Sequence, residues 1–134
     1  MFVLTLRLVT LLKVSMPEFT HKKKRYYHSV DFVMDHIGGI WKMPVLWRLK
    51  GKAMRFGEIK KDIKHISDKV LADQLKQLEQ DGFLNRKVFA EVPARVEYSL
   101  TPRGKRAIKI ITAMRNYGTQ LMKDFKVKLP KKKK

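Results

Sequence analysis

A row of polar side chains that can hydrogen-bond to phosphates or base edges is expected on one face of a helix between Ser67 and Gly82. Leu71, Leu75 and Leu78 recur at i, i+4 and i+7, so they share one stripe that must be buried. The opposite face carries Lys69, Asp73, Lys76, Gln77 and Gln80. Its ammonium and amide groups donate hydrogen bonds and its carboxylate accepts them, so this face can recognise a polar surface.

Both ends of this helix are marked by local signals. Ser67 is a good N-cap, and Asp68 places an acid in the first turn, where the helix dipole favours it. Gly82 suits the position just after the C-cap, where the backbone turns left-handed. The helix is therefore expected to end just before Gly82.

Two alternating segments, 84–91 and 95–100, follow the helix and predict a β-hairpin broken at Val92-Pro93-Ala94. One face of such a hairpin can pack on the helices while the other stays in water. Arg95 lies beside the turn, where it either reaches the sugar-phosphate backbone or is a solvated loop arginine. A helix followed at once by a basic hairpin is typical of a winged helix-turn-helix, which points to duplex DNA.

Three shorter helices are expected before these elements, at residues 29–37, 40–49 and 55–63. Gly38-Gly39 separates the first two. Trp41 and Trp47 suggest either a ligand-binding box or core packing, and we favour core packing because large aromatic side chains dominate small cores. The first helix is expected to carry Val30, Val33, Met34 and Ile37 on one stripe. The inward positions of the next two helices are expected to be Trp41, Val45, Leu46, Leu49, Phe56, Ile59 and Ile63.

A long helix is expected after the hairpin, because Thr101 can cap it and Pro102 suits the first helical position. Apolar residues then recur every three or four positions, at Ile108, Ile111, Met114 or Tyr117, Leu121 and Phe125. One small winged domain has no core large enough to cover so long a stripe. We therefore expect this helix, together with the first helix, to bind a second copy of the chain.

Six short segments in a fixed order now identify a resemblance. They are GGIWK at 38–42, LWRL at 46–49, RFGEI at 55–59, SDKVL at 67–71, LKQLEQDG at 75–82 and VPARVEYSLT at 92–101. From about residue 28 to residue 118, their spacing resembles the HxlR-type family of winged helix-turn-helix transcriptional regulators. The resemblance implies an α+β, mostly α fold with a β-hairpin wing and a C-terminal dimerisation helix. It also implies a homodimer that binds pseudo-palindromic operator DNA.

The same resemblance supports the positions of six DNA-binding residues. The candidate phosphate contacts are Arg55, Ser67 and Arg95, and the candidate base contacts in the major groove are Lys69, Asp73 and Lys76. A lysine can donate to guanine O6 or N7, and an aspartate can accept from cytosine N4. Alternatively, Asp73 pairs with Lys69 or Lys76 one helical turn away.

The chain departs from the family at a few positions. His28 stands where many members carry a sensor cysteine before the first helix, and the chain has no cysteine at all, so a thiol switch is impossible here. Ile40 replaces a usual lysine. Pro44 falls inside the second helix, where it costs little only if it lies in or just beyond the first turn.

The charge of the chain favours a nucleic-acid partner without naming one. Lysine and arginine total 31 against 12 acids, which gives a net charge of +19. This excess would concentrate DNA around the protein, but it would equally suit RNA or an anionic membrane surface. The alternative function is therefore a basic protein that binds nucleic acid without sequence preference, either nucleoid-like or RNA-associated.

The two ends are expected to differ from the central domain. We divide the chain into an extension and basic arm at 1–27, the winged-helix domain at 28–125 and a lysine-rich tail at 126–134. The apolar first 15 residues indicate a mis-set start, with Met16 as the natural one, or an extra interfacial helix or strand. Residues 22–27 are either an arm that follows the DNA or a mobile, solvated leader.

No enzymatic motif is found in the sequence. His28, Asp31, Asp35 and His36 lie close together on the first helix and suggest a metal site or a proton-linked switch, which we set aside. There is no glycine-rich phosphate loop, nucleophile elbow or zinc-protease signature. We expect a cytoplasmic regulator with no catalytic residues, no metal and no cofactor, whose partners are double-stranded DNA and a second copy of itself, with no membrane association.

Overall fold

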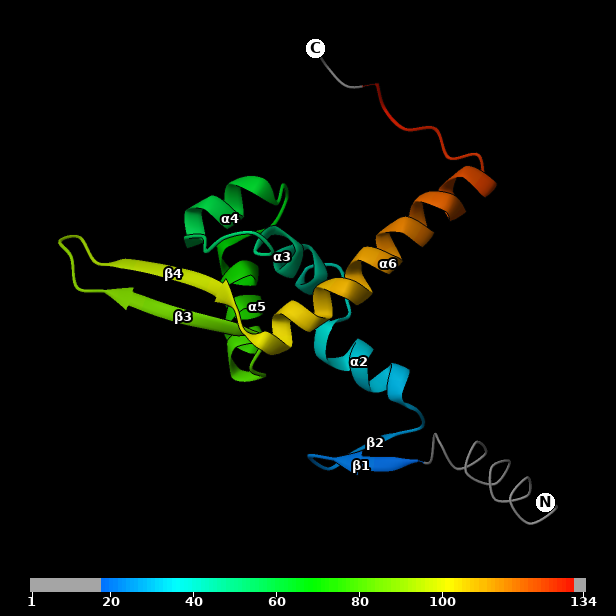
Figure 1. Ribbon diagram of the computed structural model, residues 1–134, viewed down its shortest axis with the longest axis horizontal. Coiled ribbons are helices and arrows are strands. Elements are labelled where there is room, and N and C mark those ends of the chain that lie inside the picture. Colours follow the sequence, from blue (N-terminus) through cyan, green and yellow to red (C-terminus); the bar gives the residue numbers. More distant parts are fainter. Residues whose placement is uncertain (1–17, 132–134) are drawn as a thin grey trace. The chain divides into compact units, whose positions relative to one another are not determined.

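The computed structural model describes residues 18–131, which form two compact units at 18–39 and 40–131 (Figure 1). The expectations for the first 15 residues and for a start at Met16 lie outside the described residues. The fold is mostly helical α+β, as predicted. No helix within 18–131 is both long and apolar enough to cross a membrane.

The first unit is a short β-hairpin followed by a helix. Strand β1, Phe19–His21, pairs antiparallel with β2, Lys24–Tyr26, and α2 runs over Ser29–Ile37. The helix has the predicted bounds, whereas the two strands were not predicted. Phe32 of α2 holds the hairpin, since its ring meets Phe19 and Tyr26 edge-on at centroid distances of 5.3 and 4.9 Å. Residues 24–26 are therefore part of a strand rather than a mobile leader.

The start of α2 explains the cluster of histidine and aspartate seen in the sequence. Asp31 N–H donates to His28 Nδ1 at 3.2 Å, while the Asp31 carboxylate accepts from the N–H groups of Tyr27 and His28 at 3.0 and 3.2 Å. These backbone donors, Tyr27 first, lower the pKa of Asp31. The residues are thus used in a capping box. Among the residues that the structure describes, no three potential metal-ligand side chains gather at one point.

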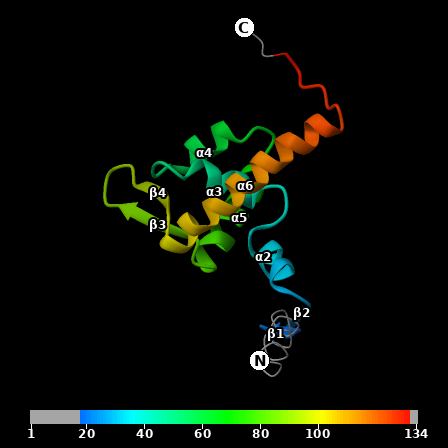
Figure 2. The same ribbon diagram turned by 45° about the vertical axis from the view of Figure 1, so that its right-hand side comes forward.

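The second unit holds the remaining elements (Figure 1). They are α3 at Lys42–Arg48, α4 at Phe56–Asp62, α5 at Asp68–Gln80, β3 at Leu84–Phe89, β4 at Arg95–Leu100 and α6 at Pro102–Asp124. Strands β3 and β4 pair antiparallel, and Figure 2 shows α6 lying against α3. Pro44 is the third residue of α3, so it lies in the first turn, where its missing N–H has no helical partner to lose.

One apolar core joins these elements. Its residues are all at most 8% exposed and include Val45, Leu46, Leu49, Ile59, Ile63, Leu71, Leu75, Leu78, Leu84, Leu100, Ala107 and Ile111. The inward stripes predicted for α3, α4 and α5 are therefore largely confirmed. Trp41 and Phe56, which were expected to be buried, are only half-buried. In the first unit, Ile37 of the predicted α2 stripe is buried, whereas Val30 and Met34 are 59% and 44% exposed.

Trp47 occupies the edge of the core rather than its centre. Its ring lies 4.3 Å from the Arg115 guanidinium and 3.9 Å from the Lys50 ammonium group. Together with Met43, Pro44, Ile111 and Met114, Trp47 and Arg115 border a hollow of about 210 Å³ between α3 and α6. The tryptophan therefore packs α3 against α6 while one side of it stays open.

Candidate nucleic-acid interface

The helix-turn-helix is formed by α4, a five-residue turn and α5. At the start of α4, the N–H of Arg55 donates to Glu58 Oε1 at 3.1 Å. In the turn, Ile63 and Ile66 are each 5% exposed and anchor the segment, while His65 adopts a left-handed φ of +71°. Ser67 Oγ then accepts a hydrogen bond from the N–H of Val70 at 3.1 Å. The predicted N-cap of α5 is confirmed, and Ser67 itself is exposed.

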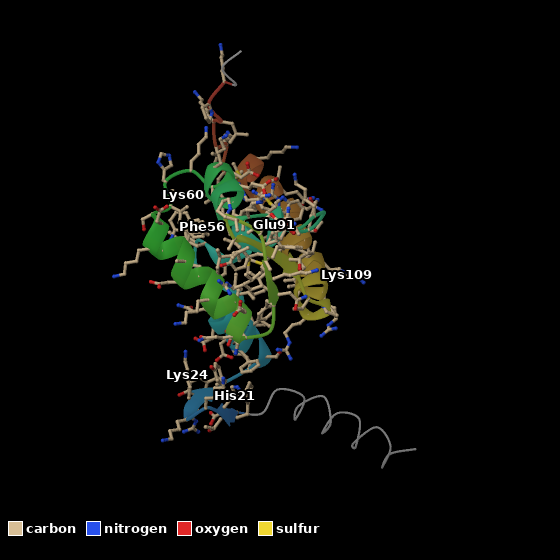
Figure 3. All side chains as sticks on the ribbon, turned by 90° about the vertical axis from the view of Figure 1, so that its left-hand side faces the viewer. His21, Lys24, Phe56, Lys60, Glu91 and Lys109 are labelled. Atoms are coloured by element: carbon tan, nitrogen blue, oxygen red, sulfur yellow. The ribbon has the colours of Figure 1, made fainter. Side chains whose placement is uncertain are left out.

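Two basic side chains link α4 to its neighbouring helices. Lys60 of α4 forms an ion pair with Asp68 in the first turn of α5, and Figure 3 shows Lys60 beside the start of that helix. Arg48 of α3 donates to the carbonyl oxygen of Asp62, the last residue of α4, at 3.2 Å. Because that carbonyl has no partner within its helix, the bond both caps α4 and ties it to α3.

The outer face of α5 is polar and open. Lys69, Asp73 and Lys76 are all exposed, and Ala72, Gln77 and Gln80 lie beside them on the surface. Within residues 18–131, Asp73 forms no ion pair with Lys69 or Lys76, so the intrahelical pairing that was the alternative is not observed. The small, exposed Ala72 lies between these groups. The whole face is available for hydrogen bonding to a partner.

The end of α5 sets where the wing begins. Gly82 has a φ of +79°, and the N–H of Phe83 returns to the carbonyl oxygen of Leu78 at 2.8 Å, as in a Schellman motif. The N–H of Gly82 likewise donates to the carbonyl oxygen of Glu79 at 3.0 Å. The predicted role of Gly82 is confirmed. Leu84 follows as a buried residue, so the chain enters β3 with its side chain in the core.

An isolated β-bridge joins the wing to the segment that precedes the helix-turn-helix. Met54, between α3 and α4, exchanges two backbone hydrogen bonds with Tyr98 of β4, at 2.9 and 2.8 Å. Within the hairpin, Leu84 faces Leu100 and Phe89 faces Arg95. The base of the wing is therefore buried and fixed, while its tip extends away from the core, as Figure 1 shows for β3 and β4.

Arg95 is not a free cation at the tip. Its guanidinium stacks on the Phe89 ring at 4.1 Å and lies 3.4 Å from Glu91 and 3.5 Å from Glu97. Its side chain is 28% exposed. Both carboxylates come from the wing itself, so the arginine holds the two ends of the loop together. Sequence alternation placed Arg95 on the wing correctly but could not show these partners.

Several other cations border the interface and were not singled out from the sequence. Arg86 and Lys87 are exposed on β3, and Lys61 and Lys64 are exposed around the turn of the helix-turn-helix. Of the wing pair, Lys87 lies 4.8 Å from the Phe89 ring, while Arg86 has no acidic partner among residues 18–131. Alternation places Arg86 on the same face of β3 as the buried Leu84, so the sequence pattern gave no signal that Arg86 is exposed.

Comparisons with known proteins agree with this geometry. The family model described as HxlR-like helix-turn-helix matches residues 36–126. An uncharacterised helix-turn-helix transcriptional regulator of Methanothermobacter thermautotrophicus is 44% identical over 93 residues, which cover 69% of this chain and 71% of that protein. The regulator YdzF of Bacillus subtilis, also uncharacterised, is 39% identical over 89 residues, covering 66% and 82% of the two chains.

Solved structures give the same result. The redox regulator HypR in its reduced form has a TM-score of 0.70 at 33% identity, covering 75% of this chain and 99% of its own. The reduced transcriptional regulator YodB of B. subtilis has a TM-score of 0.62 at 32% identity, covering 69% and 90%. Both similarities extend over nearly the whole of the known chain, so they concern the complete domain rather than the helix-turn-helix alone.

Proposed function

The chain belongs to the HxlR-like helix-turn-helix family and is a sequence-specific DNA-binding transcriptional regulator rather than an enzyme, and we propose that it acts as a homodimer on a pseudo-palindromic operator. The observation that carries this proposal is the open polar face of α5. It lies on a helix whose other face is fully buried, so the face is presented rigidly. A regulator acts on chromosomal DNA, and we place the protein in the cytoplasm for that reason.

In the proposed complex α5 lies in the major groove. Lys69, Asp73 and Lys76 then face base edges, where the ammonium groups donate to guanine and the carboxylate accepts from cytosine. Their exposure and the lack of ion pairs between them in the described part of the chain support this role. Arg55 and Ser67, at the starts of α4 and α5, are proposed to contact phosphates and set the register.

The wing contributes phosphate contacts in this proposal. Arg95 reaches a phosphate only by leaving Glu91 and Glu97, so a phosphate must replace two carboxylates there. Arg86 has no such competition within residues 18–131, and we add it as a wing contact. Lys87 beside it would raise the local positive charge.

The homodimer is supported by an apolar stripe that runs from the middle of α6 to its C-cap residue, Phe125. Five apolar side chains at helical spacing are exposed there: Ile110 at 45%, Met114 at 46%, Tyr117 at 64%, Leu121 at 36% and Phe125 at 74%. We call this set the α6 stripe. We propose that it packs on a second copy together with Val30 and Met34 of α2. Two-fold pairing would then separate the two α5 helices by about 34 Å, one turn of the duplex.

We expect this protein to respond to a different signal from the structurally similar redox regulator HypR. HypR is named a redox regulator, whereas this chain has no cysteine, so no thiol can change its state. We therefore expect the DNA affinity of this protein to be unaffected by diamide or dithiothreitol. A change in affinity with either reagent would contradict this.

The proposed function is tested by three linked measurements. Sedimentation velocity should give a dimer at micromolar concentration. Selection from random duplexes, together with footprinting of the DNA upstream of its own gene, should yield an inverted repeat. Titrations against the selected duplex and a scrambled one, at several salt concentrations, should give a specificity ratio that persists at high salt. A monomer, or a uniform loss of affinity for both duplexes, would reject the proposal and favour the non-specific alternative.

A further inference from the structure

The turn of the β1–β2 hairpin has an unusual composition for its geometry. His21 pairs with Lys24, so only Lys22 and Lys23 form the turn. Both have positive φ values, +49° and +65°, as a two-residue type I′ turn requires. The left-handed region is unfavourable for residues with a Cβ, and Asn-Gly is the preferred pair for such a turn. Two lysines are therefore held here against the conformational preference of the backbone.

Two of the four consecutive basic residues at this hairpin are neutralised by acids. Lys24 Nζ lies 2.5 Å from Asp35 Oδ1 on α2, and Arg25 pairs with Glu18. Lys22 and Lys23 form no ion pair with any residue in the range 18–131, and both are exposed. The hairpin therefore ends in two adjacent ammonium groups that no carboxylate in the described chain balances.

The strands hold this turn firmly on α2. Tyr26 is 4% exposed, and its hydroxyl donates to Asp35 Oδ2 at 2.5 Å, while Lys24 binds the other oxygen of the same carboxylate. Phe19 stacks on Tyr26 at 5.2 Å, and His21 meets Phe32 edge-on at 5.4 Å. Figure 3 labels His21 and Lys24, the residues on either side of the turn. The backbone of the turn is thus fixed before any partner binds.

From this arrangement we infer that the Lys22–Lys23 turn is a second phosphate-binding site for duplex DNA, separate from the helix-turn-helix and its wing. The inference rests on the proposed function, because the DNA that the regulator binds is the polyanion whose phosphates the turn would contact. Fixing the backbone in advance lowers the ordering cost of each contact. Since phosphates carry no sequence information, the turn strengthens binding to every duplex and does not choose among them.

The test removes the charges while improving the turn. In the full-length chain, Lys22→Asn with Lys23→Gly creates the preferred type I′ pair, so the hairpin should fold at least as well as before. Because each neutralised phosphate adds about 0.9 to the slope of log K against log salt, removing both lysines should lower that slope by about 1.8 for each chain bound. The affinity for the selected duplex and for its scrambled counterpart should fall by the same factor.

Two control variants separate the turn from net charge. Lys22→Arg with Lys23→Arg keeps both charges and should keep the wild-type affinity and salt slope. Lys109→Gln with Lys123→Gln removes the same two charges from exposed positions of α6 and should leave the salt slope nearly unchanged. A further variant, Lys22→Gln with Lys23→Gln, retains side chains of similar size at the turn and should reproduce the loss seen with Asn-Gly. Chemical shifts of the Tyr26 ring report whether the hairpin is intact in each variant.

The outcomes distinguish this inference from the proposed function. If the wild type prefers its selected duplex and the Asn-Gly variant binds with the same affinity and salt slope, the inference is wrong and the proposed function stands. If the wild type shows no preference for any duplex, the proposed function fails, and the salt slopes on unselected DNA still decide the role of the turn. A loss of binding to phosphatidylserine vesicles, with DNA binding unchanged, would overturn the inference in favour of a membrane surface.

Discussion

Replacing Gly104 by alanine should loosen the junction between α6 and the helix-turn-helix. Gly104 is the third residue of α6, and a Cβ added there would lie 2.3 Å from the carbonyl oxygen of Phe83. It would also lie 3.2 Å from Leu100 Cδ2. Ordinary van der Waals contact begins at 3.4 Å, and the closest atom belongs to the backbone, so the two segments must separate by about 1 Å.

The size of the effect follows from what this separation breaks. Thr101 Oγ1 accepts from the N–H of Gly104 at 3.1 Å and donates to the carbonyl oxygen of Gly82 at 2.6 Å. Overpacking costs about 1–3 kcal/mol, and each weakened hydrogen bond costs about 1 kcal/mol. Alanine returns at most about 1 kcal/mol through its higher helix propensity. We therefore expect a net decrease of about 2 kcal/mol in the free energy of unfolding.

Urea unfolding followed by circular dichroism measures this change, and Gly57 provides a matched control. Gly57 also lies in the first turn of a helix, but a Cβ added there meets nothing within 4 Å. Gly57→Ala should therefore stabilise the protein by about 0.5–1 kcal/mol. Glycine-to-alanine substitution is thus expected to lower the free energy of unfolding in α6 and to raise it in α4. If both variants gain stability, the close approach of Phe83 to α6 is wrong.

Three further predictions concern binding, assembly and pH. Lys69→Ala should raise the Kd for the selected duplex by about 5- to 150-fold, from a loss of about 1–3 kcal/mol per base contact, with a much smaller change for a scrambled duplex in the same titration. Tyr117→Asp places a charge in the α6 stripe and should give a monomer in sedimentation velocity. The hydrogen bond to Asp35, together with burial, raises the pKa of Tyr26 to about 12. Only the neutral phenol of Tyr26 can donate this hydrogen bond, so its contribution to the stability of the hairpin is complete below pH 10 and is lost as the pH rises towards 12. Tyr26→Phe should remove this pH dependence of hairpin stability in an NMR titration.

Elements whose signals are local were predicted closely from the sequence. Leucines at helical spacing, a serine cap and a glycine stop defined α5, and the bonds of Ser67 and Gly82 are formed as expected. The wing was also predicted, because alternation and a break at Pro93 are both visible over a few residues. The family motifs fixed the order of these elements, and the comparisons confirm it.

The first hairpin could not be predicted because its stability comes from contacts outside its own sequence. Strands of three residues are too short to show a clear alternation, and the turn lacks the glycine or asparagine that usually marks one. What holds it are Phe32 and Asp35 of α2, which lie well along the chain from Phe19. The partners of Arg95 were hidden for a similar reason, since they depend on the register that brings Phe89 opposite it.

The strongest physical argument for a partner chain is that α6 is buried in its first half and has an exposed apolar face in its second half. The first half is anchored, since Gly104, Ala107 and Ile111 are buried against the rest of the second unit. At 1.5 Å per residue the 23-residue helix is about 34 Å long, and its second half, with the C-cap Phe125, carries four of the five residues of the α6 stripe. Helices in water owe most of their stability to packing of an apolar face, so this half needs a surface to cover it. A second α6 offers a stripe of the same length and chemistry, and two-fold pairing would cover both at once.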